Sequence, residues 1–250
     1  MVSLILFCIL LSACGNDESP QQPKSVSQEE KTMDSIAVQI SKARDWQEKG
    51  EYAQALRIAD AMILQYPGQL DALSIKAEIL KEQGKQQEAL LLLEKAYALQ
   101  PRDKETAYNL AYEYAEAKDP KALSLADTLI KYDKTHTVAR AWYIKGSYFK
   151  NSGRQKEAMR FFDSSITADY HFLDAYLDKG QIAFHDKNYN AALKIFATGQ
   201  KLAPGEASFY FWVAKTQEAM GNKTDAKANY ERAYALDKTL TDAKEAAERL

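Results

Sequence analysis

The stretch WYIKGSYFKNSGRQKEAMRFF at residues 142–162 contains the pattern that decides the fold. Trp142, Gly146 and Phe149 follow one another at intervals of about one helical turn, and Ala158 and Phe162 do the same later in the stretch. Between these two groups lies a glycine, Gly153, which can adopt the left-handed conformation that ends a helix. The stretch therefore predicts two helices joined by a tight turn.

The same pattern recurs along most of the chain. Its marker alanine returns at spacings of 34, 33, 36, 34 and 34 residues, at Ala55, Ala89, Ala122, Ala158, Ala192 and Ala226. A second small residue recurs upstream of it, at Ala43, Ala77, Ala111, Gly146, Gly180 and Ala214. Small residues at these two positions allow the two helices of a copy to approach closely.

Taken together, the six copies resemble the tetratricopeptide repeat, a helix–turn–helix unit, over about residues 36–238. The resemblance implies an all-α fold, a right-handed superhelical solenoid in which each repeat covers the apolar face of its neighbour. The repeats are expected at residues 36–69, 70–103, 104–138, 139–172, 173–206 and 207–240. Residues 241–250 alternate alanine with charge and are expected to form a capping helix.

The third copy departs from this pattern. It has Lys118-Asp119-Pro120 where the other copies favour glycine, and its turn is one residue shorter. Its connection to the fourth copy, through Thr135-His136-Thr137, is longer. We therefore expect the stacking of the repeats to change locally at this point.

The composition argues against catalysis and against nucleic-acid binding. The 250 residues carry 33 Lys+Arg and 35 Asp+Glu, whereas a general nucleic-acid binder has a marked basic excess. The two cysteines lie within the first 14 residues and the three histidines are scattered, so no metal site or cofactor is expected. No catalytic arrangement and no phosphate-binding loop is found, and the sequence predicts a noncatalytic protein.

The N-terminus has the features of a secretion and lipidation signal. Residues 1–13 are mostly apolar, too short to span a membrane, and end in Leu11-Ser12-Ala13-Cys14, which resembles a bacterial lipobox. One departure is that no Lys or Arg precedes Lys24. We expect residues 1–13 to be a signal peptide, Cys14 to be lipidated, with palmitate among its acyl chains, and residues 14–35 to form a flexible tether.

The residues that follow Cys14 bear on localisation. Gly15 stands where an aspartate commonly retains such lipoproteins in the inner membrane, which favours a lipid anchor in the outer membrane of a bacterial envelope. Asp17 and Glu18 also resemble the surface-export signals of some Bacteroidetes lipoproteins. The chain could therefore face either the periplasm or the cell surface.

The family resemblance also implies where a partner binds. In tetratricopeptide proteins the first helices of the repeats line a concave groove, and in repeats three to six these positions combine aromatic and charged residues, which are common at binding hot spots. The candidates for a protein-binding groove are Tyr108, Tyr112, Arg140, Tyr143, Lys150, Leu177, Phe184, Phe211 and Lys215. Packing of these aromatic residues between neighbouring helices is the alternative interpretation.

These observations predict a noncatalytic adaptor, a lipid-anchored lipoprotein that supports assembly or regulation of a cell-envelope complex. Its groove is expected to hold an extended peptide or a helix of a protein partner. A lipoprotein of this size with six repeats resembles the pilotins, which escort secretins to the outer membrane. A glycan-binding surface lipoprotein and a self-associating structural protein are the alternatives, and the sequence leaves the oligomeric state open.

Overall fold

The computed structural model describes residues 28–132 and 138–250. This part of the chain contains thirteen α-helices and no strand, which confirms the all-α fold class. The helices are α1 (Gln28–Glu48), α2 (Tyr52–Gln65), α3 (Leu70–Glu82), α4 (Gln86–Leu99), α5 (Lys104–Glu116), α6 (Lys121–Tyr132), α7 (Val138–Asn151), α8 (Gln155–Ala168), α9 (Leu173–His185), α10 (Tyr189–Leu202), α11 (Ala207–Ala219), α12 (Lys223–Leu236) and α13 (Thr241–Arg249).

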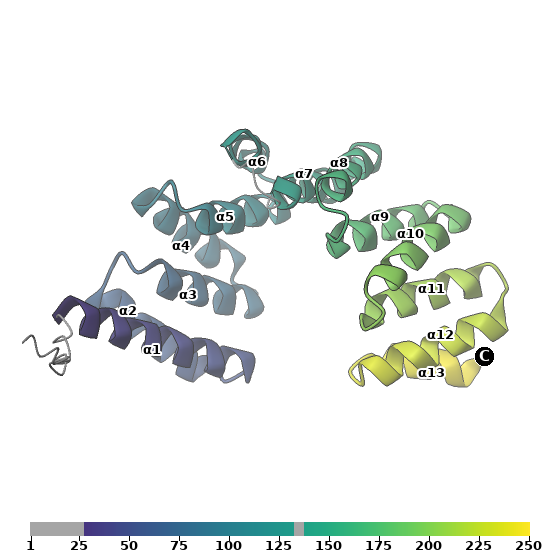
Figure 1. The fold of residues 1–250 in the computed structure, drawn as a ribbon, viewed down its shortest axis with the longest axis horizontal. Helices are drawn as coiled ribbons and strands as arrows, with labels where there is room; N and C mark the ends of the chain where they lie inside the picture. The colour runs from purple at the N-terminus through teal and green to yellow at the C-terminus, as the bar shows by residue number, and fades with distance from the viewer. Residues whose placement is uncertain (1–27, 133–137) are drawn as a thin grey trace, which may run out of the picture.

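The helices stack in chain order as six pairs and a final cap. Each odd-numbered helix packs on the even-numbered helix that follows it, from α1 with α2 to α11 with α12, and α13 packs on α12. Figure 1 shows that the stack bends into an arch, with α1 at one foot and α13 at the other. Six helix–turn–helix repeats and a capping helix are thus present, as the sequence predicts.

The turn between the two helices of each repeat contains a residue in the left-handed conformation in all six copies. Gly50, Gly84, Gly153 and Gly221 have φ between 74° and 86°, in the left-handed region. Lys118 and Lys187 stand at the same position in the third and fifth repeats, with φ of 58° and 59°. The shared geometry lets the backbone N–H of the next residue return to the last turn of the helix, as in Asp119 N to Tyr114 O at 2.8 Å and Arg154 N to Phe149 O at 2.8 Å. The third repeat therefore forms the common turn without glycine.

The first helix is longer than expected. It begins at Gln28, so residues 28–35 belong to α1, and the prediction that the flexible tether extends to residue 35 is wrong in this part. These residues contain neither glycine nor proline, and they include glutamates, which favour the first turns of a helix. The predicted signal peptide 1–13, Cys14 and the link Thr135-His136-Thr137 lie outside the described residues.

In the fourth and fifth repeats, the core pairs a glycine of the first helix with a phenylalanine of the second. A Cβ atom built on Gly146 would lie 2.4 Å from the ring of Phe162, and one built on Gly180 would lie 2.4 Å from the ring of Phe196. Both rings are fully buried. Glycine therefore accompanies phenylalanine, whereas the third repeat combines Ala111 with Ala126.

The stacking changes at the third and fourth repeats. Helix α7 packs directly on α5 as well as on α6, and the amide of Asn151 donates to the carbonyl oxygen of Ala115 at 3.2 Å. Ser147, on the face of α7 that approaches α5, is 1% exposed. Helices α3 and α5, in contrast, diverge and make few contacts. This divergence opens the hollow described next.

Candidate groove for a protein partner

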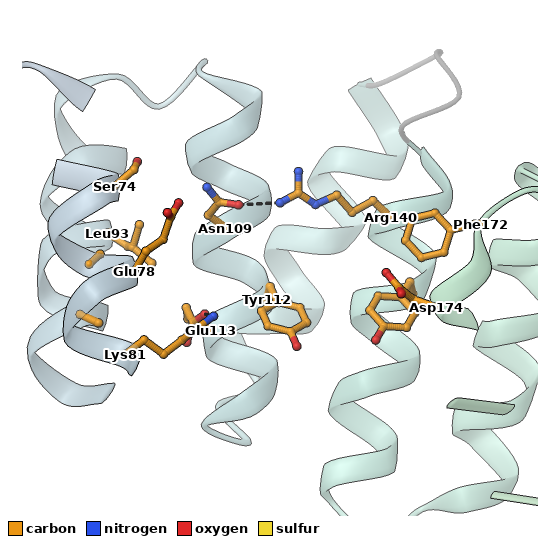
Figure 2. A pocket seen from close by; sticks show the side chains of 13 residues that line it. Ser74, Glu78, Lys81, Leu93, Asn109, Tyr112, Glu113, Arg140, Phe172 and Asp174 are labelled. Carbon is orange, nitrogen blue, oxygen red and sulfur yellow. Dashed lines mark hydrogen bonds and ion pairs between the residues drawn. The ribbon is translucent and has the colours of Figure 1, made fainter. Parts of the chain in front are cut away.

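A hollow of about 580 Å³ lies on the side of the array that the odd-numbered helices line, between α3, α5, α7 and the start of α9. Figure 2 shows side chains from these helices pointing into it. It is lined by Ser74, Ala77, Glu78, Lys81, Ala89, Leu93, Asn109, Tyr112, Glu113, Arg140, Tyr143, Phe172 and Asp174. We call this hollow the central groove.

The floor of the central groove is formed by buried residues, and α3 carries small side chains where it faces α5. Ser74 and Ala77 leave a gap between the two helices, and through this gap the hollow reaches Leu93 on the underlying helix α4. An apolar floor between polar walls is the usual composition of a protein-binding surface.

Two neighbouring hollows adjoin the central groove. It shares Glu78 with a second hollow between α1 and α3, and it shares Lys81, Tyr112 and Glu113 with a third hollow at the start of α4. The three hollows form one path across the first five repeats. A path of this length suits an extended segment of polypeptide better than a small ligand.

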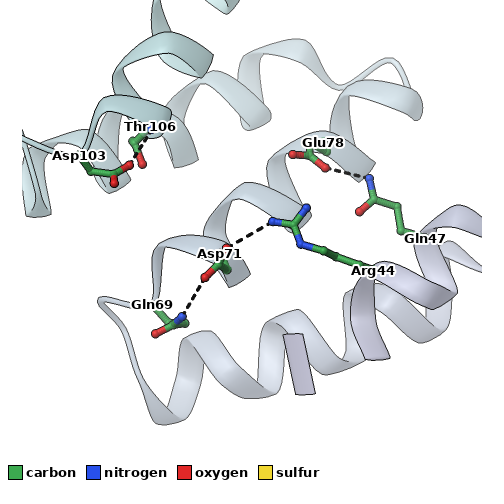
Figure 3. A network of polar contacts seen from close by, with 7 residues as sticks. All are labelled: Arg44, Gln47, Gln69, Asp71, Glu78, Asp103 and Thr106. Atoms are coloured by element: carbon green, nitrogen blue, oxygen red, sulfur yellow. Dashed lines mark hydrogen bonds and ion pairs between the residues drawn. The ribbon is translucent and has the colours of Figure 1, made fainter. Parts of the chain in front are cut away.

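Ion pairs and hydrogen bonds connect neighbouring odd-numbered helices across the groove. The ammonium of Lys81 lies 2.8 Å from Glu113, and the guanidinium of Arg140 lies 2.8 Å from Glu105 and 2.5 Å from the amide oxygen of Asn109. Figure 3 shows the same arrangement between α1 and α3, where Arg44 lies 3.3 Å from Asp71 and the amide of Gln47 donates to Glu78 at 3.0 Å. These pairs orient the groove walls and satisfy most of their charges.

Tyr112 is the aromatic side chain at the centre of the path. It is half-buried, and the ammonium of Lys81 lies 5.4 Å from the centre of its ring. Burial, with the nearby carboxylates of Glu116 and Glu113, raises its pKa to about 12. Tyr112 therefore remains a neutral phenol at physiological pH and can offer both a ring face and a hydroxyl to a ligand.

Asp174 differs from the other carboxylates of the groove. Among the residues that the structure describes, no side chain forms an ion pair or hydrogen bond with its carboxylate. Asp174 is exposed, yet partial desolvation at the groove wall raises its pKa, and the carboxylates of Asp178 and Glu206 raise it further. An unpaired carboxylate held near two others favours a cation as its partner. Within the described residues, Asp174 is thus an exposed groove carboxylate without an ion-pair or hydrogen-bond partner.

Three of the nine predicted groove residues, Tyr112, Arg140 and Tyr143, line the central groove. Tyr108 does not face it: its side chain is 2% exposed, and the guanidinium of Arg140 lies 5.0 Å from the centre of its ring. Tyr108 is thus buried where α5 and α7 approach closely, which agrees with packing between neighbouring helices and not with a place in the groove. Tyr143 is also partly committed to the fold, since its hydroxyl donates to Asp178 at 3.0 Å.

Lys150 lies beside this site, 2.8 Å from the buried carboxylate of Asp178. The four remaining candidates, Leu177, Phe184, Phe211 and Lys215, lie farther along the array, on α9 and α11. There, Phe184 packs against Trp212 at 5.5 Å between ring centres, and the ammonium of Lys215 lies 4.9 Å from the Trp212 ring. Phe184 thus joins α9 to α11, whereas Phe211 packs on Tyr230 of α12 at 5.8 Å between ring centres.

Sequence reasoning missed part of the site. Leu93 belongs to an even-numbered helix, and Phe172 precedes α9, so neither occupies a position that the family resemblance assigns to the groove. The predicted candidates came from repeats three to six, yet Ser74, Glu78 and Lys81 of the second repeat form one wall of the central groove. The combination of Ser74 and Ala77 on one helix face was the signal that could have indicated a gap.

Two further features of the described residues bear on function. Across residues 28–132 and 138–250, His, Cys, Asp and Glu do not gather into a group of three or more that could hold a metal ion. Within the same residues, none of the helices has the length and apolar character needed to cross a membrane.

Comparison with known families identifies the repeats. Models of the tetratricopeptide repeat match residues 41–104, 139–171 and 207–240, which together make up more than half of the chain. The chain belongs to the tetratricopeptide-repeat family. Proteins of this family mediate protein–protein interactions, and their repeats typically serve as noncatalytic scaffolds.

Solved structures of the family share the fold at low sequence identity. A tetratricopeptide-repeat protein from Parabacteroides merdae is 17% identical with a TM-score of 0.69, covering 85% of this chain and 82% of that one. PilW, described as a type IV pilus biogenesis factor, is 18% identical with a TM-score of 0.65, covering 80% and 92%. PilF from Pseudomonas aeruginosa is 13% identical with a TM-score of 0.60, covering 86% and 97%.

Curated relatives match over shorter segments. Human superkiller complex protein 3 is 25% identical over 138 residues, which are 55% of this chain and 9% of that protein. The bovine protein SGT1 homolog is 33% identical over 78 residues, which are 31% of this chain and 23% of that protein. The matched segments thus span less than a quarter of either relative, and they reflect the repeat that these proteins share.

Proposed function

We propose that the central groove binds an extended segment of a protein partner, with a basic side chain of that segment beside Asp174. The observation that carries this proposal is the unpaired carboxylate of Asp174 at the wall of an apolar-floored hollow. A lysine or arginine of the ligand would neutralise it, and an apolar side chain of the same segment would contact the ring of Tyr112, which lies between Asp174 and the second repeat in Figure 2. The remaining polar walls are already paired and contribute shape and orientation.

The test compares two variants with the same change of charge. Peptides are selected from a random display library against the wild-type chain, and the selected peptides are then measured against Asp174→Lys and against Glu245→Lys, a substitution of an exposed residue on α13. We expect selected peptides to contain Lys or Arg next to an apolar residue. Asp174→Lys should weaken their binding about tenfold or more, and Glu245→Lys should leave it unchanged.

The outcomes of this selection separate the possibilities clearly. Equal binding by wild type and Asp174→Lys would show that the central groove does not recognise a basic side chain. If the selected peptides also bind Tyr112→Ala as tightly as wild type, they do not bind in the central groove, and the proposal fails. Circular dichroism of each variant provides the control for folding.

We propose further that the chain acts as a lipid-anchored adaptor in the bacterial envelope. The motif ending in Cys14 supports the anchor, and the repeat family supports the adaptor role. The pilotin-like role rests on likeness of fold to PilW and to PilF from Pseudomonas aeruginosa, and at under 25% identity that likeness concerns the fold alone.

Anchoring is tested by a single substitution. Cells that express the wild-type chain or Cys14→Ser are fractionated, and the mass of the mature N-terminus is determined. We expect the wild-type chain in the outer-membrane fraction with acyl chains on Cys14, and the variant in the soluble fraction or unprocessed. An unacylated wild-type N-terminus would refute the anchor and leave the groove proposal untouched.

A further inference from the structure

A second hollow lies in the third repeat, away from the central groove. It has a volume of about 470 Å³ and lies between the end of α4, the start of α5 and the second half of α6. Tyr97, Pro101, Leu125, Leu129 and Tyr132 supply most of its apolar lining, and Ala107 also lines it. It shares no lining residue with the central groove, and we call it the rear hollow.

The rear hollow exists because one side chain is small. Ala107 stands four residues before the small residue of its first helix, and at the same position the other repeats from the second onward carry Leu73, Trp142, Tyr176 and Tyr210. Three of these four are aromatic. The third repeat thus lacks the large side chain that fills this space in its neighbours.

The neighbouring repeats show what the space holds when it is filled. In the fourth repeat, Trp142 stacks on Phe161 at 6.0 Å between ring centres, and Leu125 is the counterpart of Phe161 in the rear hollow. In the sixth repeat, the hydroxyl of Tyr210 donates to the carbonyl oxygen of Pro204 at 3.2 Å, and Pro101 is the counterpart of Pro204. The walls of the rear hollow are therefore equivalent to walls that hold an aromatic ring elsewhere in this chain.

Arg102 supplies a positive charge at the rim of the rear hollow. Arg102, Lys104 and Asp103 line the rear hollow, and the carboxylate of Asp103 accepts the backbone N–H of Thr106 at 2.7 Å as the N-cap of α5. No carboxylate forms an ion pair with Arg102 among the residues that the structure describes. A ligand with an acidic residue beside its aromatic side chain therefore complements both the apolar walls and the rim.

We propose that the rear hollow is a second docking site, which receives a tryptophan or tyrosine side chain of an acidic segment from a protein partner. The inserted ring takes the place that Trp142 and Tyr210 occupy within their own repeats. An adaptor with two such sites can hold two partners, or two segments of one partner, on opposite sides of α5. The proposal is independent of the central groove.

The test uses short probes and a variant that fills the hollow from inside. The full chain, labelled with ¹⁵N, is titrated with the blocked dipeptides acetyl-Glu-Trp-amide, acetyl-Glu-Ala-amide and acetyl-Lys-Trp-amide, and binding is read from amide shifts at Ala107, Thr128 and Leu129. We expect acetyl-Glu-Trp-amide to bind in the millimolar range. The Ala probe and the Lys probe should each bind about tenfold more weakly.

Ala107→Trp should abolish these shifts, because its ring occupies the space. It should also raise the melting temperature by about 2–4 °C, as expected when a hollow is filled. Ala107→Tyr serves as the second filler, since tyrosine stands at this position in the fifth and sixth repeats. Leu64→Trp, which adds the same side chain at an exposed position on α2, is the matched control and should leave the shifts unchanged.

Three results would overturn the proposal. The first is the absence of shifts at the rear hollow with acetyl-Glu-Trp-amide up to its solubility. The second is unchanged binding by a folded Ala107→Trp. The third is a concentration-dependent dimer, seen by light scattering and lost in Ala107→Trp, which would replace the partner by a second copy of this chain.

Discussion

The third and fourth repeats have the same backbone plan but different interiors. The fourth repeat combines Gly146 with Phe162, and Trp142 stacks on Phe161. The third repeat combines Ala111 with Ala126, has Ala107 in place of the tryptophan, and contains the rear hollow. The comparison teaches that the helix–turn–helix backbone tolerates a wide range of packing, and that the size of a few side chains decides where space remains.

The two repeats also close their turns with different residues. Gly153 has a φ of 76°, and Lys118 has a φ of 58° at the same position. A side chain in the left-handed region costs about 1–2 kcal/mol relative to a right-handed conformation, whereas glycine adopts it freely. The third repeat is thus the weaker copy both in its turn and in its packing.

The largest effect is expected when the fourth repeat loses its Phe162 ring, which has no counterpart in the third repeat. Phe162→Ala should lower the free energy of unfolding by about 3–5 kcal/mol, because the ring is fully buried and leaves a cavity beside Gly146. Urea denaturation followed by circular dichroism measures the change. Adding Gly146→Ala, which reproduces the alanine pair of the third repeat, should restore part of the loss. A fully additive loss would show that the two positions are not coupled.

The reverse change overfills the fourth repeat. Gly146→Ala alone should cost about 1–3 kcal/mol, because its Cβ would lie 2.4 Å from the Phe162 ring. Combining it with Phe162→Leu, the pair found as Ala77 and Leu93 in the second repeat, should relieve the clash. Thermal melts of the single and double variants test this, and an Ala substitution with no cost would contradict the packing account.

A smaller effect is expected at the turns. Lys118→Gly should raise the free energy of unfolding by about 1 kcal/mol, since glycine removes the strain of the left-handed conformation. Gly153→Lys should have the opposite sign, because it introduces that strain into the fourth repeat. Denaturation midpoints of both variants provide the measurement. The same sign in both would mean that local contacts of the lysine side chain, not backbone conformation, control this position.

The smallest effect concerns the central groove and depends on pH. The pKa of Asp174 is raised in the folded state, so the folded chain binds this proton more tightly than the unfolded chain, and the contribution of Asp174 to stability falls as pH rises above its ordinary pKa of 3.8. Asp174→Asn should therefore be slightly more stable than wild type at pH 7. This advantage should disappear below pH 3.8. A variant that is less stable than wild type at pH 7 would show that the carboxylate supports the fold.

Much of the fold could be predicted from the sequence because it repeats. The spacing of Ala55, Ala89 and Ala122 and their later counterparts fixes the number of repeats, and the glycines fix most of the turns. The tether boundary could not be placed in this way, since residues 28–35 continue the helix without repeating any pattern. Whether residues 28–35 form a helix depends on the helix propensity of their side chains alone.

The candidate site was predicted only in part. Tyr112, Arg140 and Tyr143 were found because the family resemblance assigns groove positions within each first helix. Tyr108 was assigned to the groove by the same rule, yet it is buried, because the distance between neighbouring first helices varies along the array. That distance depends on how each pair packs, and no single position in the sequence records it.

The sequence by itself determined the repeating helix pairs, their turns and the alternation of small and large residues, because these follow from local spacing and side-chain size. The tertiary structure alone decided where space is left. The divergence of α3 from α5 opens the central groove, and the absence of a ring at Ala107 becomes a hollow only when α4, α5 and α6 surround it. Cavities depend on contacts among several helices at once, so they appear only after the repeats are stacked.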